Sequence, residues 1–308
     1  PGRFDRQVLV APPDRDGREA ILLAHAKDKP LARDLDLRDV ARKTTGMTGA
    51  QLANALNEGA IIAGRAGRHE MRREDLDEAL LRQAVGSQQA RRLSSRERRI
   101  VAYHEAGHAL CRRLLGLDPP EILSIVPRGP ALGFVGHSPQ EYSYLKSREE
   151  LLDEVVTLLG GRAAEELVIG EAFSGASDDL NRVHMVCKQM VSEFGMGVAV
   201  DHDGPPPIAL PTGDYAVSDQ TRRDVDLAAM TLAREAYRRA QALISANLEV
   251  LDHLAVLALE RETLTREELD GIFAAHELRG LVDAPRSGGA LVAMSRETPP
   301  GGFASPSQ

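Results

Sequence analysis

The chain contains the stretch His104-Glu105-Ala106-Gly107-His108, in which two histidines stand four residues apart. An α-helix turns about 100° per residue, so side chains four apart lie one above the other on the same face. Two imidazoles stacked in this way can both reach one metal ion. Glu105 lies about a quarter-turn round the helix, where it is badly placed as a third ligand but can reach a water beside the ion. The spacing predicts a zinc site in which His104 and His108 hold the ion and Glu105 acts as general base.

Local signals around this motif predict the helix that the geometry requires. Ser94 followed by Glu97 forms a capping box, and Gly116 suits a left-handed C-cap. The alternative is an ordinary helix with two surface histidines. Buried imidazoles need polar partners, however, and a metal ion supplies them. One mainly apolar stripe of the helix contains both histidines and consists of Ile100, His104, His108, Cys111 and Leu115. Within this stripe Cys111 is expected to be a small buried side chain rather than a ligand.

A catalytic zinc ion also needs a third protein ligand and an open position. Asp179 is the first candidate, because Ser177 is expected to cap a helix that begins with Asp178 and Asp179. Acidic residues are common in a first helical turn for another reason, since they oppose the helix dipole. Glu165 and Glu166 are rival ligands, on a helix predicted to run from a capping box at Ser147 and Glu150 through Gly160 and Gly161. Spacing alone does not separate these candidates.

The rest of the chain reads as mainly helical. Helices are predicted near 17–27, 35–44, 49–66, 73–85, 219–247 and 248–260, and Thr265 with Glu268 caps a last short helix. Residues 122–126 and 131–135 read as two short strands joined by a turn rich in proline and glycine. An exposed edge of this hairpin is expected to accept an extended substrate backbone.

Six segments occur in a fixed order along the chain: GRFDRQ at 2–7, GMTGAQLAN at 46–54, YHEAGH at 103–108, VPRG at 126–129 with LG at 132–133, GGRAAEE at 160–166, and GASDD at 175–179. Together they resemble the FtsH family of membrane-anchored ATP-dependent zinc metalloproteases. The resemblance implies that Asp179 completes the zinc shell and that Glu165 and Glu166 orient a histidine through its other ring nitrogen. It also implies that Arg3 and Arg6 are arginine fingers, which grip the nucleotide of a neighbouring subunit in the intact protein.

The expected fold is mainly α, with a helical AAA lid domain followed by a mostly helical zinc metallopeptidase domain that carries a small β-hairpin or sheet. By resemblance, residues 1–86 are the end of an AAA ATPase core and its lid, and 95–280 are the peptidase domain. Residues 87–94 read as a polar linker that acts as a hinge. From 281 to 308 proline, glycine and serine dominate without periodicity, so this tail is expected to be disordered.

Other features limit the partners. The sequence has no G-x-x-x-x-G-K-[ST] loop, so ATP and Mg²⁺ are expected only in a full-length protein. It has no run of eighteen apolar residues, so membrane contact is expected only through segments that precede residue 1, and this fragment is expected to be soluble. A net charge of -8 argues against nucleic acid, and two cysteines without paired spacing fit a reducing compartment.

The predicted function is that of a zinc endopeptidase within an ATP-dependent protease. By resemblance it degrades unfolded or membrane proteins as a homo-hexamer on the cytoplasmic side of the cell membrane. One alternative is a catalytically silent regulatory or assembly module of the same fold, and another is a free-standing metallopeptidase unrelated to ATP. The presence of His104, Glu105, His108 and Asp179 together disfavours the silent module.

Overall fold

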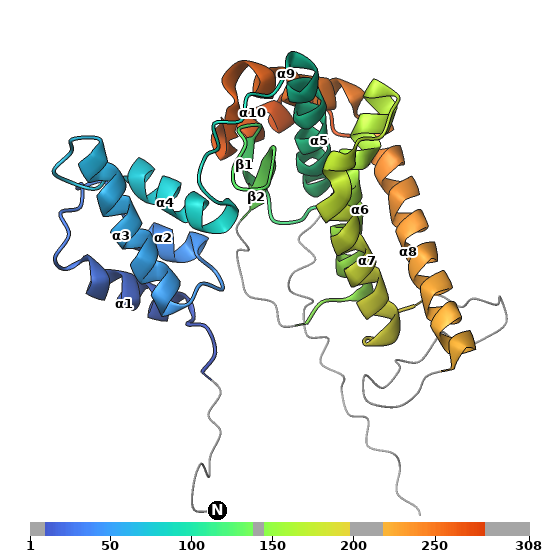
Figure 1. The fold of residues 1–308 in the computed structure, drawn as a ribbon, viewed down its shortest axis with the longest axis horizontal. Helices are drawn as coiled ribbons and strands as arrows, with labels where there is room; N and C mark the ends of the chain where they lie inside the picture. The colour runs from blue at the N-terminus through green and yellow to red at the C-terminus, as the bar shows by residue number, and fades with distance from the viewer. Residues whose placement is uncertain (1–9, 138–144, 198–217, 281–308) are drawn as a thin grey trace, which may run out of the picture.

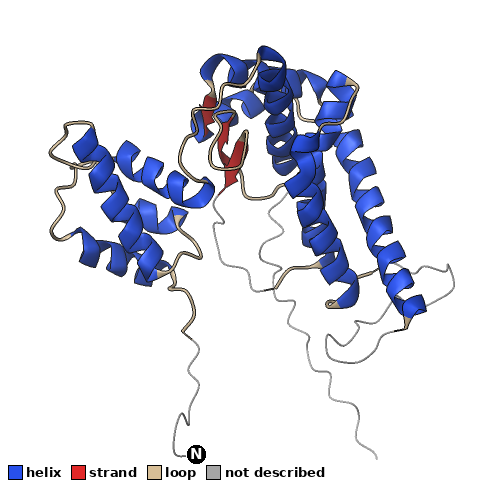
Figure 2. Cartoon of the chain, in the orientation of Figure 1, coloured by secondary structure: helices blue, strands red, loops and turns tan. Residues whose placement is uncertain are grey.

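The computed structural model describes residues 10–137, 145–197 and 218–280 (Figure 1). Helices dominate this part of the chain and the strands form one small sheet (Figure 2), which confirms the predicted mainly α fold. Arg3, Arg6 and the 281–308 tail lie outside the described residues.

The N-terminal helices form a separate unit, drawn in blue and cyan in Figure 1. They are α1 (Arg15–Ala26), α2 (Leu37–Lys43), α3 (Gly49–Arg65) and α4 (Arg73–Val85), each close to its predicted span. Asp14 caps α1, and Thr48 with Gln51 forms a capping box at α3. These helices enclose their own apolar core, which includes Leu22, Val40, Leu52, Leu56 and Leu76.

The remaining helices surround a second, larger core. They are α5 (Ser95–Leu114), α6 (Arg148–Ala164), α7 (Ser177–Ser192), α8 (Asp219–Ala246), α9 (Leu248–Arg261) and α10 (Arg266–Ala274). Helix α5 lies between α6 and α9, and α6 in turn packs against α7 and α8 (Figure 1). The helix with the two histidines is therefore held from two sides by core helices.

Capping explains where these helices begin. The predicted capping boxes are confirmed at Ser94 with Glu97, at Ser147 with Glu150 and at Thr265 with Glu268, the last of which starts α10. The predicted N-cap at Ser177 is wrong by one residue. A 3₁₀ turn (Ser174–Ala176) runs straight into α7, so Ser177 already has helical backbone angles and its side chain does not cap the helix.

The sheet is small and antiparallel, with strand order β2-β1-β3. The predicted hairpin consists of β1 (Pro120–Ser124) and β2 (Phe134–His137), both displaced from their predicted spans. The displacement arises because the segment between them is a turn, which reciprocal hydrogen bonds between Arg128 and Ala131 close at 2.9 Å. The third strand, β3 (Thr263–Thr265), was not predicted because it has only three residues, and it pairs with β1.

Candidate metal centre

Three predicted ligands from two helices meet at one point. Helix α5 presents His104 and His108, whose Nε2 atoms lie 3.0 Å apart with their rings nearly perpendicular. Asp179 comes from the first turn of α7, with its Oδ2 atom 3.2 Å from Nε2 of His104 and 3.4 Å from Nε2 of His108. This is the only group of three or more such side chains with converging ligand atoms in the part of the chain that the structure describes.

The hydrogen bond made by Nδ1 of each ring determines whether the converging Nε2 atom carries a proton. Nδ1 of His108 lies 2.8 Å from the carbonyl oxygen of Thr157, which can only accept a hydrogen bond, so this nitrogen carries the proton. Nδ1 of His104 lies 2.7 Å from the carboxylate of Glu165, which favours the same tautomer. Each neutral imidazole then turns an unprotonated Nε2 lone pair toward the other and toward the Asp179 carboxylate. The two Nε2 lone pairs and the carboxylate oxygen repel one another unless a cation lies between them.

The separations of the donor atoms fit a zinc ion. Zinc binds imidazole nitrogen and carboxylate oxygen at about 2.0–2.2 Å with tetrahedral geometry, which places neighbouring ligand atoms about 3.3 Å apart. The three distances between the donor atoms are 3.0, 3.2 and 3.4 Å. Two imidazoles and one carboxylate leave one of the four tetrahedral positions for water or substrate.

The electrostatics of the cluster also favour a positive charge. Burial by itself lowers the pKa of His104, but hydrogen bonds with Asp179 and Glu165 outweigh it and raise the pKa to about 10. For Asp179 burial raises the pKa, but hydrogen bonds with both histidines outweigh it and hold the pKa below its usual range. The carboxylates around the histidines thus stabilise a cation, which can be a proton or a metal ion.

Glu105 lies beside this cluster without belonging to it. Its side chain is buried, and burial raises its pKa above the usual value for glutamate although His104 and His108 act in the opposite direction. Gly133 packs directly against it, since a Cβ atom there would lie 2.8 Å from Oε1 of Glu105. A buried carboxylate with a raised pKa suits a group that takes up and returns a proton near neutral pH.

The two rival glutamates point in different directions. Glu165 stands at the start of a π-helical turn (Glu165–Ile169) that continues α6, and its second oxygen accepts a hydrogen bond from the backbone N–H of Phe173 at 3.1 Å. Glu166, the next residue, contacts neither histidine. It accepts hydrogen bonds from Arg162 at 2.7 Å and from the hydroxyl of Tyr237 at 2.5 Å. The structure therefore places only Glu165 beside a histidine. Glu166 is the next residue on the helix, so its side chain points in a different direction, toward α8.

Several residues that shape the site were not predicted to do so. Thr157 acts through its backbone carbonyl, which no side-chain pattern reveals. Gly161 leaves room for the rings, because a Cβ atom there would lie 2.6 Å from Nε2 of His108 and 2.7 Å from Cε1 of His104. Gly107 and Gly160 similarly let α5 and α6 meet backbone to backbone. The signal for this contact was the glycine pair inside a predicted helix, which indicates close approach.

Cys111 does not join the ligand group. Its side chain is fully buried, and burial raises the pKa of its thiol to about 12. The thiol is therefore neutral at physiological pH, as expected for a small core residue.

The profile of peptidase family M41 matches residues 91–272, a region that contains His104, Glu105, His108 and Asp179. The chain belongs to peptidase family M41. A second profile, described as the AAA+ lid domain, matches residues 34–78. The predicted resemblance to FtsH zinc metalloproteases is thereby confirmed, and the His104, His108 and Asp179 cluster fits a zinc peptidase with an aspartate as third ligand.

Relatives named ATP-dependent zinc metalloprotease FtsH are similar along most of this M41 chain. That of Cutibacterium acnes is 42% identical over 284 residues, which cover 89% of this chain and 39% of the relative. That of Thermus thermophilus is 43% identical over 284 residues, covering 88% and 44%. That of Pseudothermotoga lettingae is 42% identical over 282 residues, covering 87% and 45%. The chain thus spans less than half the length of these relatives.

Among the described residues, none of the helices by itself combines the length and the apolar composition that a membrane span requires. Helices α8 and α9 meet that test only as a pair, with a bend of 82° between them.

Proposed function

We propose that this chain is the zinc-dependent endopeptidase part of an ATP-dependent protease, with His104, His108 and Asp179 as the zinc ligands. The convergence of two imidazole nitrogens and one carboxylate oxygen within 3.4 Å of one another carries this proposal. Family membership supports it, because the M41 match covers all three residues.

The side chains divide the chemical work between them. Zinc, when bound, supplies a Lewis acid that polarises a peptide carbonyl and lowers the pKa of a neighbouring water. Glu105 takes the proton of the attacking water and returns it to the departing amine, for which its raised pKa is suited. Glu165 and the carbonyl of Thr157 hold the two rings by their Nδ1 atoms and so keep both Nε2 atoms directed at one point.

The substrate chain is proposed to lie along β2. Among the described strands β2 pairs only with β1, so its other edge has no described strand as partner and is the proposed place for a further strand. Strand addition uses main-chain hydrogen bonds, which gives binding with little dependence on side chains. Unfolded polypeptides and unfolded segments of membrane proteins present such backbones, so they are the proposed substrates.

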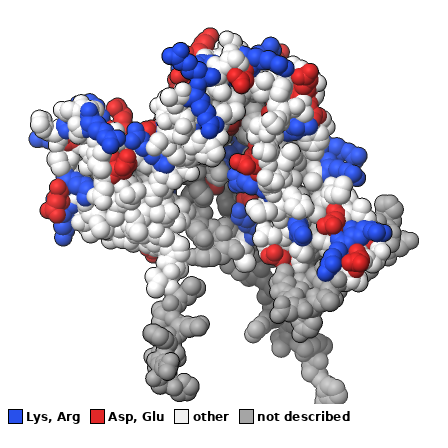
Figure 3. Space-filling view, viewed as in Figure 1, with Lys and Arg blue, Asp and Glu red and all other residues white. Residues whose placement is uncertain are grey.

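Other partners are carried over from the family resemblance. We propose that the full-length protein forms a homo-hexamer on the cytoplasmic side of the cell membrane. We also propose that it has an ATP- and Mg²⁺-binding core elsewhere, and that Arg3 and Arg6 are arginine fingers. The exclusion of nucleic acid also remains a prediction. It is supported by the net charge of -8 and by the mixing of basic and acidic side chains over the face seen in Figure 3.

A direct assay distinguishes the proposed peptidase from the alternative, a catalytically silent regulatory or assembly module. Degradation of casein is measured with added zinc for the wild type and for Glu105→Gln, and zinc content is measured for both. We expect the substitution to reduce the rate by about 100-fold or more at unchanged zinc content, because general base catalysis contributes about 10²–10⁴-fold. Equal rates in the two proteins contradict an enzymatic role for this site.

A further inference from the structure

The lid meets the peptidase domain where α4 ends (Figure 1). The linker after α4 pairs in antiparallel fashion with the turn between β1 and β2, here called the 126–131 turn. The N–H of Gln89 donates to the carbonyl of Pro127 at 2.9 Å, and the N–H of Gly129 donates to the carbonyl of Ser87 at 3.1 Å. The beginning of the predicted hinge is therefore attached to the peptidase domain by backbone hydrogen bonds.

One side-chain contact reinforces this attachment. The guanidinium group of Arg128, in the 126–131 turn, donates from Nη1 and Nη2 to both carboxylate oxygens of Glu78 on α4, at 3.2 and 2.8 Å. The Arg128 side chain is 10% exposed and that of Glu78 is 26% exposed. Two parallel hydrogen bonds between a guanidinium and a carboxylate fix orientation as well as distance.

Glu78 is in turn fixed from the lid side. Arg82, one turn further along α4, donates to it at 2.7 Å and also reaches Glu58 on α3 at 3.3 Å. Burial alone raises the pKa of Glu78, but hydrogen bonds from Arg128 and Arg82 outweigh it and lower the pKa. The carboxylate is thus ionised and bound to both domains at neutral pH.

The same turn leads directly to the catalytic glutamate. Reciprocal backbone hydrogen bonds between Arg128 and Ala131 make the turn a closed unit. Two residues after Ala131, Gly133 packs against Glu105 so closely that a Cβ atom there would lie 2.9 Å from its Cγ. A displacement of the turn therefore changes the surroundings of Glu105 within a few residues.

We propose that Arg128 is a positioning residue, whose pairing with Glu78 fixes the lid on the peptidase domain and holds the segment from Arg128 to Gly133 in place against Glu105. Glu78 is the only acceptor for the Arg128 side chain among the described residues, and the Nε atom of Arg128 is buried there without a hydrogen-bond partner. Loss of the Glu78 charge leaves the buried guanidinium of Arg128 without a counter-charge, which costs free energy. Separation of the lid from the peptidase domain exposes the guanidinium to water and removes this cost.

The test uses Glu78→Gln with Asp77→Asn as its matched control. Asp77 is the neighbouring residue on the same helix and pairs with Arg73 within the lid at 3.5 Å, so its neutralisation does not involve the peptidase domain. Spin labels at Arg65→Cys on α3 and Ser245→Cys on α8 report the distance between the domains, because both positions are exposed while Cys111 and Cys187 are buried. Arg128→Gln removes the same pair from the peptidase side, with circular dichroism as the check on folding.

We expect Glu78→Gln to widen the distribution of inter-label distances at least about twofold, and Asp77→Asn to leave it unchanged. On the proposed function, Glu78→Gln also lowers kcat for casein about three- to tenfold with KM and zinc content unchanged, since small misplacement of a catalytic group costs up to about 10²-fold. A distribution as narrow as that of Asp77→Asn overturns the proposal, as does a widened distribution with unchanged kcat. If Glu105→Gln proves fully active, the proposed function fails, and the label distances still test the contact between the domains.

Discussion

His108 and Thr157, on different helices, are joined by a hydrogen bond from Nδ1 of the imidazole to the backbone carbonyl oxygen at 2.8 Å. A carbonyl oxygen cannot donate and does not titrate, so it sets the tautomer of this ring at any pH at which the ring is neutral. The ring nitrogen that faces Asp179 is then an acceptor only. On the proposed function, zinc binding therefore depends on a backbone atom of α6 in addition to the motif in α5.

A comparison of the neighbouring residues Asp178 and Asp179 tests which of them is the third zinc ligand. We predict that Asp179→Asn lowers zinc affinity by more than the roughly 100-fold that loss of an outer-shell partner costs. Asp178→Asn, which removes the same charge from the same helical turn, changes it less than about threefold because Asp178 is exposed and outside the ligand group. Competition with a fluorescent zinc chelator measures both affinities. Equal losses in the two variants would exclude Asp179 as a specific ligand.

The two adjacent glutamates provide a second comparison. Glu165→Gln is expected to weaken zinc binding about 10- to 100-fold, because Glu165 orients His104 through its Nδ1 atom. Glu166→Gln is expected to leave zinc affinity within about threefold of the wild type, since this residue pairs with Arg162 and Tyr237 instead. The same chelator competition applies, and a larger loss for Glu166→Gln than for Glu165→Gln contradicts the assignment.

Gly161 is expected to be important for zinc binding because a larger side chain does not fit beside the two histidine rings. The methyl group of Gly161→Ala would lie 2.6–2.8 Å from three ring atoms of His104 and His108, so at least one ring must move. We predict at least about a tenfold loss of zinc affinity, comparable to the loss of a ligand-orienting partner. Gly271→Ala is the matched control, because the site lies inside α10 with nothing within 4 Å of the new methyl group. That variant should bind zinc normally and gain about 0.5–1 kcal/mol in stability. Normal zinc binding by Gly161→Ala would show that the rings are not held as described.

Local signals predicted the helices and much of the site. Helix starts were predicted well because Ser94 and Ser147 satisfy unpaired backbone N–H groups in a way that short sequence patterns reveal. The histidine pair was equally clear, since its spacing places both rings on one face of a single helix. Asp179 was different, because no local pattern shows that α7 meets α5, and only the family resemblance separated it from Glu165.

Long-range contacts explain what the sequence did not reveal. The carbonyl of Thr157 and the bond between Arg128 and Glu78 depend on how helices and domains meet, which composition and periodicity do not determine. The strand β3 is too short to give an alternating pattern, and it exists because β1 offers it an edge. The N-cap at Ser177 was misplaced because a preceding 3₁₀ turn changed where the helix begins.

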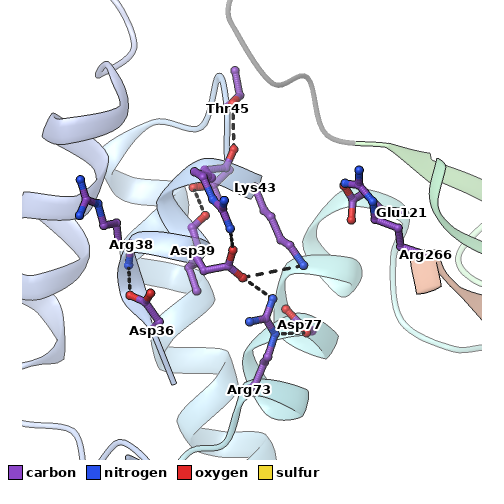
Figure 4. Close-up of polar contacts among 12 residues, drawn as sticks. Asp36, Arg38, Asp39, Lys43, Thr45, Arg73, Asp77, Glu121 and Arg266 are labelled. Atoms are coloured by element: carbon purple, nitrogen blue, oxygen red, sulfur yellow. Dashed lines mark hydrogen bonds and ion pairs between the residues drawn. The ribbon is translucent and has the colours of Figure 1, made fainter. Parts of the chain in front are cut away.

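The lid is expected to lose stability in acid through Asp39. Asp39 accepts hydrogen bonds from Arg42 and Arg73, and Lys43 lies 4.0 Å away (Figure 4). Burial raises the pKa of Asp39, but these hydrogen bonds outweigh it and lower the pKa below the ordinary value of 3.8. A carboxyl group whose pKa is lower in the folded state stabilises the fold above its unfolded pKa, and this contribution disappears as the pH falls through the folded value.

Thermal unfolding of Asp39→Asn measures this effect. We predict a lid destabilised by up to about 1 kcal/mol at pH 7, a small value because solvent partly screens the ion pairs. The difference from the wild type should shrink as the pH falls below 3.8, where the carboxyl of the unfolded wild-type chain binds a proton more readily than that of the folded chain. Asp77→Asn, which loses only an exposed pairing with Arg73, should show a smaller difference at pH 7 (Figure 4). A difference for Asp39→Asn that is independent of pH contradicts the electrostatic explanation.

The central claim is that one zinc ion binds between His104, His108 and Asp179. An anomalous difference map on either side of the zinc absorption edge, from crystals grown with equimolar zinc, tests it most directly. The predicted result is one strong zinc-specific peak about 2.0–2.2 Å from Nε2 of each histidine and from one oxygen of Asp179. A map with no peak between these three side chains, or with the peak bound by other residues, would contradict the claim.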